Sequence, residues 1–437
     1  MTPSHIHRHS NGLVTVVMDR PATHQVRVLM MVRVGSRFES AEELGISHFL
    51  EHVLFRGCEG FPDGDTLNRA FEEGGGMLDA HTGVETTDFD MTVHPAKLSQ
   101  SLAVLARFLR WPAFAELEKE REILLDELSY DYNEQHRMIN PAILTAELMW
   151  PDHPLGRCVG GVPATISAMG EKQIRTHHAR YYRPENMVLG LAGRLEGEDV
   201  IAMVDRHFGD WKPAPGDRGE NPAAPPIPAP RSSAGVPGGP GVKVVPDSGN
   251  QFHLQIGLPA PGYNDAAELT AILLTRILDD GPTSRLQRVI REEMALVYHI
   301  DAGYSAYWDA GTLDISTSVA TGRLELLLKH LFEELSRFRR FGPTEDELER
   351  ARMRHLYDLD FEGDSLSAQL GRYAWPQLYS TVRGVEEERE GIAAVTLEQL
   401  REMAESAVSR EHARLALVGP ADSGTERSLM DALERWE

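Results

Sequence analysis

Cysteine is scarce in this sequence, because the 437 residues include only Cys58 and Cys158. Two cysteines cannot form the disulfide framework of small secreted domains, so we expect a reducing compartment. Basic residues are also in deficit: 44 lysines and arginines stand against 67 acidic residues, which gives a formal net charge of −23. This balance argues against a nucleic-acid partner, which requires a basic surface, and against adsorption to anionic lipids.

Long apolar runs are missing as well. No stretch of 18 or more apolar residues occurs in the sequence, so we predict no membrane-spanning helix and no membrane partner. The first ten residues contain no apolar signal segment, and strand-like alternation begins at Leu13. We therefore expect an unprocessed, cytoplasmic protein. The length is too great for one ordinary hydrophobic core, so two or three domains are expected.

A proline-rich stretch divides the chain. Residues 212–241 contain nine prolines together with many glycines, alanines and serines, and such a composition cannot build a core. We predict an N-terminal domain at 1–211, a linker at 212–241 and a C-terminal domain at 242–437.

The two halves share a pattern near their ends. Gln173 begins a predicted helix that leads to a strand ending at Gly193, and Gln399 begins another that leads to a strand ending at Gly419. The two segments align without a gap, which indicates the duplication of a whole domain.

The stretch most indicative of chemistry is H-x-x-E-H at His48, Glu51 and His52, within a helix predicted over 42–56. Positions four apart lie on one helical face, so both histidines can bind one metal ion while Glu51 lies at the edge of that face. A catalytic zinc usually has three protein ligands and one open position. The charged helix predicted over 115–132 offers several carboxylates as the third ligand, and spacing alone does not choose among them: Glu116, Glu118, Glu120, Glu122, Asp126 and Glu127.

The sequence resembles the pitrilysin (insulinase-like) family of inverted-motif zinc peptidases over nearly its whole length. In that family the motif is followed about 75 residues later by a ligand glutamate in the pattern E-x-x-x-x-x-x-E, which Glu120 and Glu127 match here. The resemblance implies that Glu127 is the third zinc ligand and that Glu120 is a supporting active-site carboxylate. It also implies an α+β fold of two tandem homologous domains, each a mostly antiparallel sheet with helices on one face.

Two further segments carry the resemblance to substrate binding. The stretch from Gly75 to Thr82 resembles the family's edge strand that pairs with extended substrate, although Asp79 stands where asparagine is usual. In the second half, an arginine and a tyrosine seven residues apart resemble the pair that grips the substrate backbone. The implied substrate-binding residues are Asp79, Ala80, Thr82, Arg291 and Tyr298.

Together these features predict a zinc-dependent endopeptidase that hydrolyses extended or unfolded peptides inside a closed chamber, with Glu51 as the general base. A homodimer is expected, or a heterodimer with a related subunit. The alternatives are a subunit of a heterodimeric processing peptidase, a non-catalytic scaffold, or a hydrolase of non-peptide substrates. We expect four other residues to be structural: Cys58, His153, His177 and His178.

Overall fold

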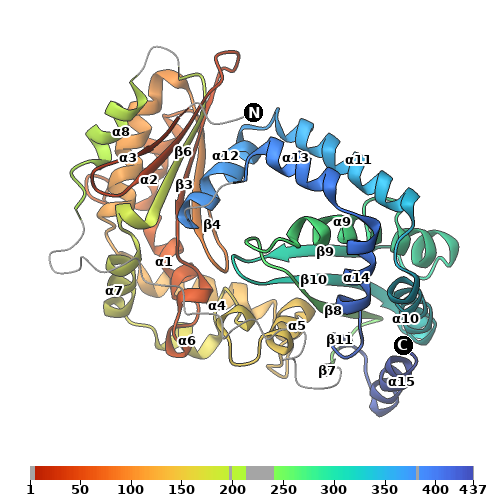
Figure 1. Cartoon of the computed structure of the whole chain (residues 1–437). Helices are drawn as coiled ribbons and strands as arrows, with labels where there is room; N and C mark the ends of the chain where they lie inside the picture. Colours follow the sequence, from red (N-terminus) through yellow and green to blue (C-terminus); the bar gives the residue numbers. More distant parts are fainter. Residues whose placement is uncertain (1–4, 196–198, 213–240, 380–382, 437) are drawn as a thin grey trace. The chain divides into compact units, whose positions relative to one another are not determined.

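The structure is a computed structural model that describes residues 5–195, 199–212, 241–379 and 383–436. These residues form two compact units, each a sheet with helices, which confirms the predicted α+β class with two related domains (Figure 1). The first unit comprises the described residues within 1–128, 157–225 and 359–385. The second unit comprises those within 129–156, 226–358 and 386–437.

Six strands build the sheet of the first unit, in the order β1-β2-β6-β3-β5-β4, and all neighbours are antiparallel except β2 and β6. Apolar residues on one face of the sheet, such as Val28 and Met30, form one core with the helices. The strands are β1 (His5–Arg8), β2 (Val14–Asp19), β3 (Val26–Val32), β4 (Leu78–Thr82), β5 (Thr87–Val93) and β6 (Met187–Gly193).

Seven helices of the first unit come from the N-terminal half of the chain, and α12 (Leu366–Ala374) comes from the C-terminal half. The seven are α1 (Ile46–Leu54), α2 (Gly64–Glu72), α3 (Leu98–Arg110), α4 (Leu117–Ser129), α6 (Pro163–Ala168), α7 (Glu171–Tyr181) and α8 (Val200–Phe208). The predicted helix over 163–182 is thus two helices, because the chain turns at Met169 and Gly170.

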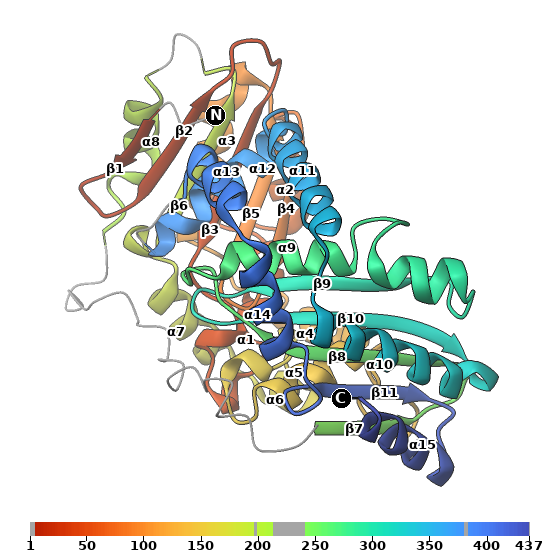
Figure 2. The same ribbon diagram turned by 45° about the vertical axis from the view of Figure 1, so that its right-hand side comes forward.

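The second unit repeats this plan with five strands in the order β7-β11-β8-β10-β9, which Figure 2 shows in succession. Its strands are β7 (Gly241–Pro246), β8 (Gln251–Ala260), β9 (Ile300–Ala306), β10 (Gly311–Ala320) and β11 (Arg414–Gly419). Its helices are α5 (Pro141–Met149), α9 (Glu268–Leu278), α10 (Leu324–Phe341), α11 (Glu345–Glu362), α13 (Val385–Ala394), α14 (Leu397–Ala407) and α15 (Ser423–Glu434), with the end of α11 assigned to the first unit.

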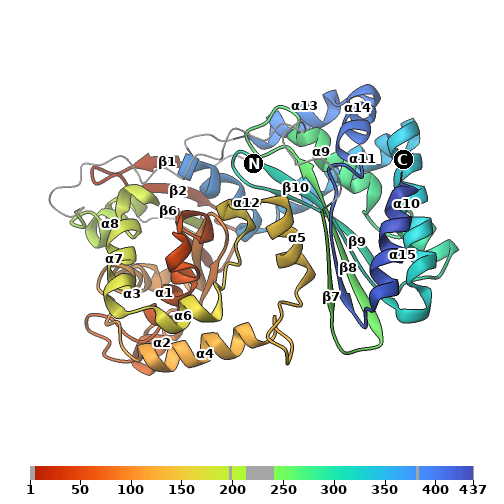
Figure 3. The ribbon, with the colours of Figure 1, turned by 90° about the horizontal axis from the view of Figure 1, so that it is seen from below.

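Each unit takes one helix from the other half of the sequence. Helix α12, drawn in blue in Figure 1, packs with Leu370 and Tyr373 on the second face of the β2-β6-β3 sheet. Helix α5 packs with Leu144 on the second face of β8 and β11, as seen from below in Figure 3. The predicted halves 1–211 and 242–437 therefore hold most of each unit but do not coincide with them. The helices also cover both faces of each sheet, whereas one covered face was predicted.

A glycine lies under each exchanged helix. A Cβ atom at Gly190 of β6 would lie 2.9 Å from Leu370 Cδ2, and one at Gly257 of β8 would lie 2.7 Å from Thr145 Cγ2. Both contacts are too short for a side chain, so glycine permits the helix to approach the sheet. The predicted linker at 212–241 lies, apart from its first and last residues, outside the described part of the chain.

The aligned glutamines have equivalent structural roles. Gln173 Oε1 accepts the N–H of Gly170 at 2.9 Å at the start of α7, and Gln399 Oε1 accepts the N–H of Thr396 at 2.8 Å at the start of α14. Each satisfies an N–H group at a helix start that would otherwise lack a partner. Among the helices in the described ranges, none combines the length and the apolar content required to cross a membrane.

The histidines predicted to be structural are buried. His178 Nε2 lies 2.8 Å from the carbonyl oxygen of Leu109, and burial lowers the pKa of His178 to about 4. His153 and His177 are also buried, and Cys58 is 4% exposed within the first core.

His178 predicts a measurable pH effect. Its folded pKa lies below its unfolded value of about 6.5, so only the unfolded state binds the proton between those values, and stability is lost as pH falls through this window. His178→Gln should lower the free energy of unfolding, but the gap to wild type should narrow by about 1.4 kcal/mol between about pH 7.5 and about pH 5.5. Urea unfolding at both pH values measures the difference in free energy of unfolding between the two proteins. Because the other titrating groups are common to both proteins, their contributions cancel in this difference. A constant gap would contradict the buried neutral imidazole.

Candidate metal centre

Helix α1 carries the two histidines, and it begins later than predicted. Residues 41–43 form a separate 3₁₀ turn, and Gly45 precedes the helix with φ of +86°. A Cβ atom at Gly45 would lie 2.6 Å from the carbonyl oxygen of Gly160, so the chain requires glycine at this left-handed position. Four apolar side chains hold the buried face of the helix in the core: Ile46, Phe49, Leu50 and Val53.

The histidine pair lies on the partly exposed face of this helix. The His48 and His52 ring centroids are 4.8 Å apart and the rings are nearly perpendicular. One nitrogen of each ring and one carboxylate oxygen of Glu127 all lie within 4.8 Å of one another. Glu127 Oε1 lies 3.9 Å from His48 Nε2, and its Oε2 lies 3.8 Å from His52 Nε2.

These three side chains fit a divalent metal ion. The separations exceed the length of a hydrogen bond, whereas ligands of a tetrahedral zinc with bonds of about 2.0–2.2 Å stand roughly 3.3–3.6 Å apart. Two imidazoles and one carboxylate are a donor set that zinc accepts, with a fourth position left open. Among the described residues, this is the one group of three such side chains with converging ligand atoms.

The packing of helix α4 decides which of the six candidate carboxylates lies beside the two histidines. Glu120, Leu124 and Leu128 recur every four residues and form its buried stripe, and Glu127 follows at the exposed edge of that stripe. Glu116 precedes the helix and pairs with Arg56 and Lys119. The geometry therefore places Glu127, and not Glu116, beside the histidine pair.

Glu120 supports the site from behind. Its side chain is 1% exposed, its Oε2 atom lies 3.1 Å from His52 Nδ1, and its other oxygen forms an ion pair with Arg56. A proton on Nδ1 that is donated to Glu120 leaves the Nε2 lone pair of His52 available to a metal ion. Arg56 balances the buried charge. Arg56 was not predicted from the sequence, although its position four residues after His52, in the turn that follows α1, was a usable signal.

The surroundings of His48 also suit a metal ligand. Burial, and then the neighbouring His52, lowers the pKa of His48. A lowered pKa favours the neutral imidazole, which is the form that binds a metal ion.

Glu51 is held by the edge strand β4. The hydroxyl of Thr82 donates a hydrogen bond of 2.5 Å to Glu51 Oε2. Thr82 is buried at the end of β4, so its side chain orients Glu51 rather than facing solvent. Thr82 was predicted from the sequence to bind substrate. Its contact with Glu51 was not predictable from sequence spacing, because the two residues are 31 positions apart.

Strand β4 forms one edge of its sheet. Among the described residues it pairs with β5 alone, so its second edge carries backbone groups with no strand beside them. Ala80 packs partly against the core, and Asp79 is exposed. Such an edge can accept an extended peptide by strand addition.

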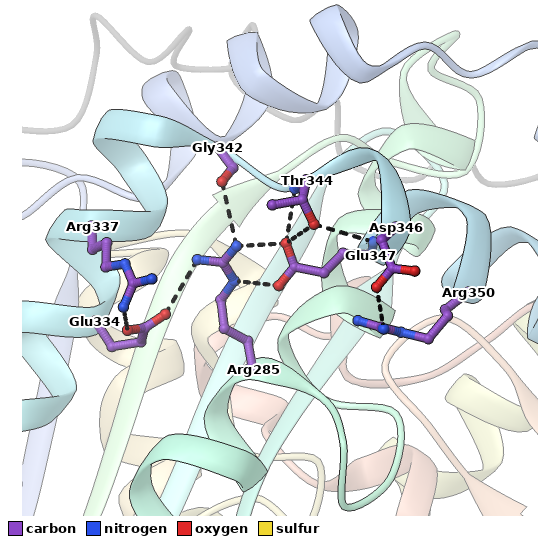
Figure 4. Close-up of polar contacts among 8 residues, drawn as sticks. All are labelled: Arg285, Glu334, Arg337, Gly342, Thr344, Asp346, Glu347 and Arg350. Atoms are coloured by element: carbon purple, nitrogen blue, oxygen red, sulfur yellow. Dashed lines mark hydrogen bonds and ion pairs between the residues drawn. The ribbon is translucent and has the colours of Figure 1, made fainter.

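Arg291 and Tyr298 lie beside each other in the second unit, with the Arg291 guanidinium 6.0 Å from the centre of the Tyr298 ring. Tyr298 is 87% exposed, and Arg291 lies in the π-helical turn Gln287–Glu293. A buried network anchors the start of this segment: Arg285 binds Glu347 through two nitrogens at 2.6 and 2.9 Å and Glu334 at 3.2 Å (Figure 4). The role of Arg291 and Tyr298 toward substrate stays a prediction.

Fold and site together define a class of protein: two sheet-and-helix domains, one of which carries an inverted H-x-x-E-H metal motif with a glutamate from a second helix. Comparison with known proteins agrees with this class. Residues 14–159 match the family model described as Insulinase (Peptidase family M16), and residues 169–354 match the model of the Peptidase M16 inactive domain.

Relatives and solved structures give the same result over nearly the full length. An uncharacterized zinc protease of Mycobacterium leprae is 30% identical over 415 residues, which are 94% of this chain and 90% of that protein. A protease from Helicobacter pylori has a TM-score of 0.85 at 20% identity, with 96% of this chain and 100% of that chain covered. The first half of the periplasmic protease PqqL from Escherichia coli has a TM-score of 0.75 at 18% identity, with 100% and 97% covered. The chain belongs to the insulinase family of peptidases, family M16, as the sequence predicted.

Proposed function

We propose that this protein is a zinc-dependent endopeptidase that cleaves extended or unfolded peptides. One observation carries the proposal: ligand atoms of His48, His52 and Glu127 converge, while Glu51 of the same helix is oriented by Thr82. The intact set argues against a non-catalytic scaffold, because a scaffold needs neither the three ligands nor an oriented base.

The residues of the chain suit peptide hydrolysis. Zinc bound by the three ligands would supply Lewis-acid activation of water and of the scissile carbonyl. Glu51 would take the proton of the attacking water and deliver it to the leaving amine, as a positioned acid–base group does. Thr82 would keep the carboxylate of Glu51 in place through both transfers.

The proposed substrate lies as an added strand along β4. Strand addition binds mainly the backbone of the peptide, so we propose broad side-chain specificity. Hydrolysis of a non-peptide substrate is less well supported, since it would not need a free strand edge beside Glu51.

A mixed pool of unstructured peptides tests the proposed activity. We expect cuts at internal peptide bonds that disappear with a zinc chelator and return when zinc is added. Stoichiometric zinc without any cleavage would instead favour the alternative of a scaffold, or of one subunit of a heterodimeric processing peptidase.

We further propose that two copies of the chain form a dimer that closes a chamber around the substrate. In the structure described as the periplasmic protease PqqL, this chain covers only 50% of the PqqL chain, while 99% of this chain is covered. A neighbour that carries two such lengths in one chain supports a pair of copies here. A cytoplasmic location stays a prediction from the sequence.

Mixing two inactive variants tests whether Arg291 serves the zinc of its own chain or that of the partner. Glu51→Gln lacks the base, and Arg291→Ala lacks the predicted substrate contact. If Arg291 acts across the dimer, one of the two sites of the mixed dimer has both groups intact. The mixed dimer should then show about half of the activity of a wild-type dimer. If it acts within one chain, no site has both groups. A protein that remains monomeric by light scattering would contradict the dimer.

A further inference from the structure

A buried carboxylate caps the helix that bears the histidines. Glu39 lies six residues before Gly45, the residue that precedes the helix, and is 4% exposed. Its Oε2 atom accepts the N–H of Gly45 at 2.8 Å, and its Oε1 atom accepts the N–H of Ser47 at 2.9 Å. The first N–H groups of a helix have no partner within the helix, and Gly45 offers no side chain to serve them. Glu39 therefore replaces the usual cap from a separate turn of the chain.

Glu39 is itself held from two sides. Its N–H donates to the carbonyl oxygen of Ser36 at 3.4 Å, and its own carbonyl oxygen accepts a hydrogen bond from Arg157. Burial raises the pKa of Glu39 to about 7, although the bonds from the helix N-terminus oppose this shift. Burying a carboxylate costs free energy, and the N–H groups at the start of the helix stabilise its charge together with the positive charge of Arg157.

The two histidines differ in what fixes them. His52 Nδ1 contacts Glu120, whereas His48 Nδ1 is buried and has no hydrogen-bond partner among the residues that the structure describes. His48 follows Ser47 directly in the first turn of α1. Its ring direction therefore depends on the backbone of that turn, which is the part of the helix that Glu39 binds.

We propose that Glu39 is a positioning residue of the metal centre: its carboxylate fixes the first turn of α1 and thereby the direction in which His48 presents Nε2. The inference rests on the proposed metal site. In this proposal Glu39 supports His48, as Glu120 supports His52.

The test compares Glu39→Gln with Asp205→Asn at about pH 8. The control replaces the carboxylate whose Oδ1 atom lies 2.6 Å from His9 Nδ1, a contact that involves no residue of the metal centre. Zn²⁺ and Co²⁺ affinities are measured by competition with a chelator, the Co²⁺ absorption spectrum reports ligand geometry, and thermal unfolding is measured without metal.

Both variants should lose stability, but only Glu39→Gln should weaken metal binding, by roughly 10–100-fold, and change the Co²⁺ spectrum. An unchanged affinity and spectrum in folded Glu39→Gln would overturn the inference and leave the proposed function intact. A wild-type protein that binds neither ion would overturn both.

Hydrogen exchange of the wild-type protein gives a second measurement that needs no variant. Amides in the first turn of a helix usually exchange fast because they lack partners. The amides of Gly45 and Ser47 should instead be protected. Exchange of these two amides at the rate of exposed ones would overturn the role of Glu39.

Discussion

Glu51→Gln should abolish peptide cleavage while the protein retains its zinc. Glutamine keeps the shape of the side chain but cannot take a proton from water, and the loss of a positioned acid–base group lowers the rate by roughly 10²–10⁴-fold. Glu51 does not belong to the converging ligand set, so metal content should not change. Turnover of a fluorogenic peptide, together with zinc measured by elemental analysis, reports both properties.

Two further variants, one at the hydrogen-bond partner of Glu51 and one control, test the same role of Glu51. Thr82→Val removes the hydroxyl that donates to Glu51. Because a hydrogen bond to a charged group contributes about 1.5–3 kcal/mol, this variant should lose roughly ten- to a hundredfold in rate. Glu122→Gln on the exposed side of α4 should behave as wild type. Full activity in Glu51→Gln would exclude Glu51 as the base.

Glu127→Ala should release the metal from a folded protein. The side chain is 56% exposed, so its removal leaves the core intact, but two histidines remain where three ligands were. We expect metal affinity to fall by more than the roughly 10–100-fold typical of a lost supporting contact. Titration with a chromophoric chelator measures the affinity, and circular dichroism confirms the fold.

Helix α4, which carries Glu127, offers two further variants whose expected losses of metal affinity differ. Glu122→Ala is the matched control, because this glutamate is exposed on the same helix and does not belong to the ligand set. Glu120→Gln should show the intermediate loss expected for the contact to His52. Equal affinities of Glu127→Ala and Glu122→Ala would show that the third ligand lies elsewhere.

Local patterns predicted those parts of the site that a single helix determines. The spacing of His48 and His52 indicates a shared face because helical geometry is local. The start of α1 was placed too early, since it depends on Gly45 and on a carboxylate from another turn. The choice of Glu127 among six acids required the resemblance, because only the packing of α4 against the core decides which carboxylate lies beside the histidines.

The exchange of α5 and α12 was not predictable from periodicity. An amphipathic helix indicates that it covers an apolar surface but not which one. Gly190 and Gly257 were the available signals, since a glycine within a buried strand indicates a close approach by another backbone or side chain. Without coordinates, nothing in the sequence connects Gly190 to α12.

This exchange of helices affects how the chain can fold while it is synthesised at the ribosome. When residues 1–211 have emerged, one face of their sheet, with Val14, Val16 and Val188, still lacks the helix that covers it. That helix follows only after most of the second half has been translated, so the nascent first half waits with an open apolar surface that chaperones can bind. A gene cut at the proline-rich stretch would yield two products, each deprived of a helix encoded by the other.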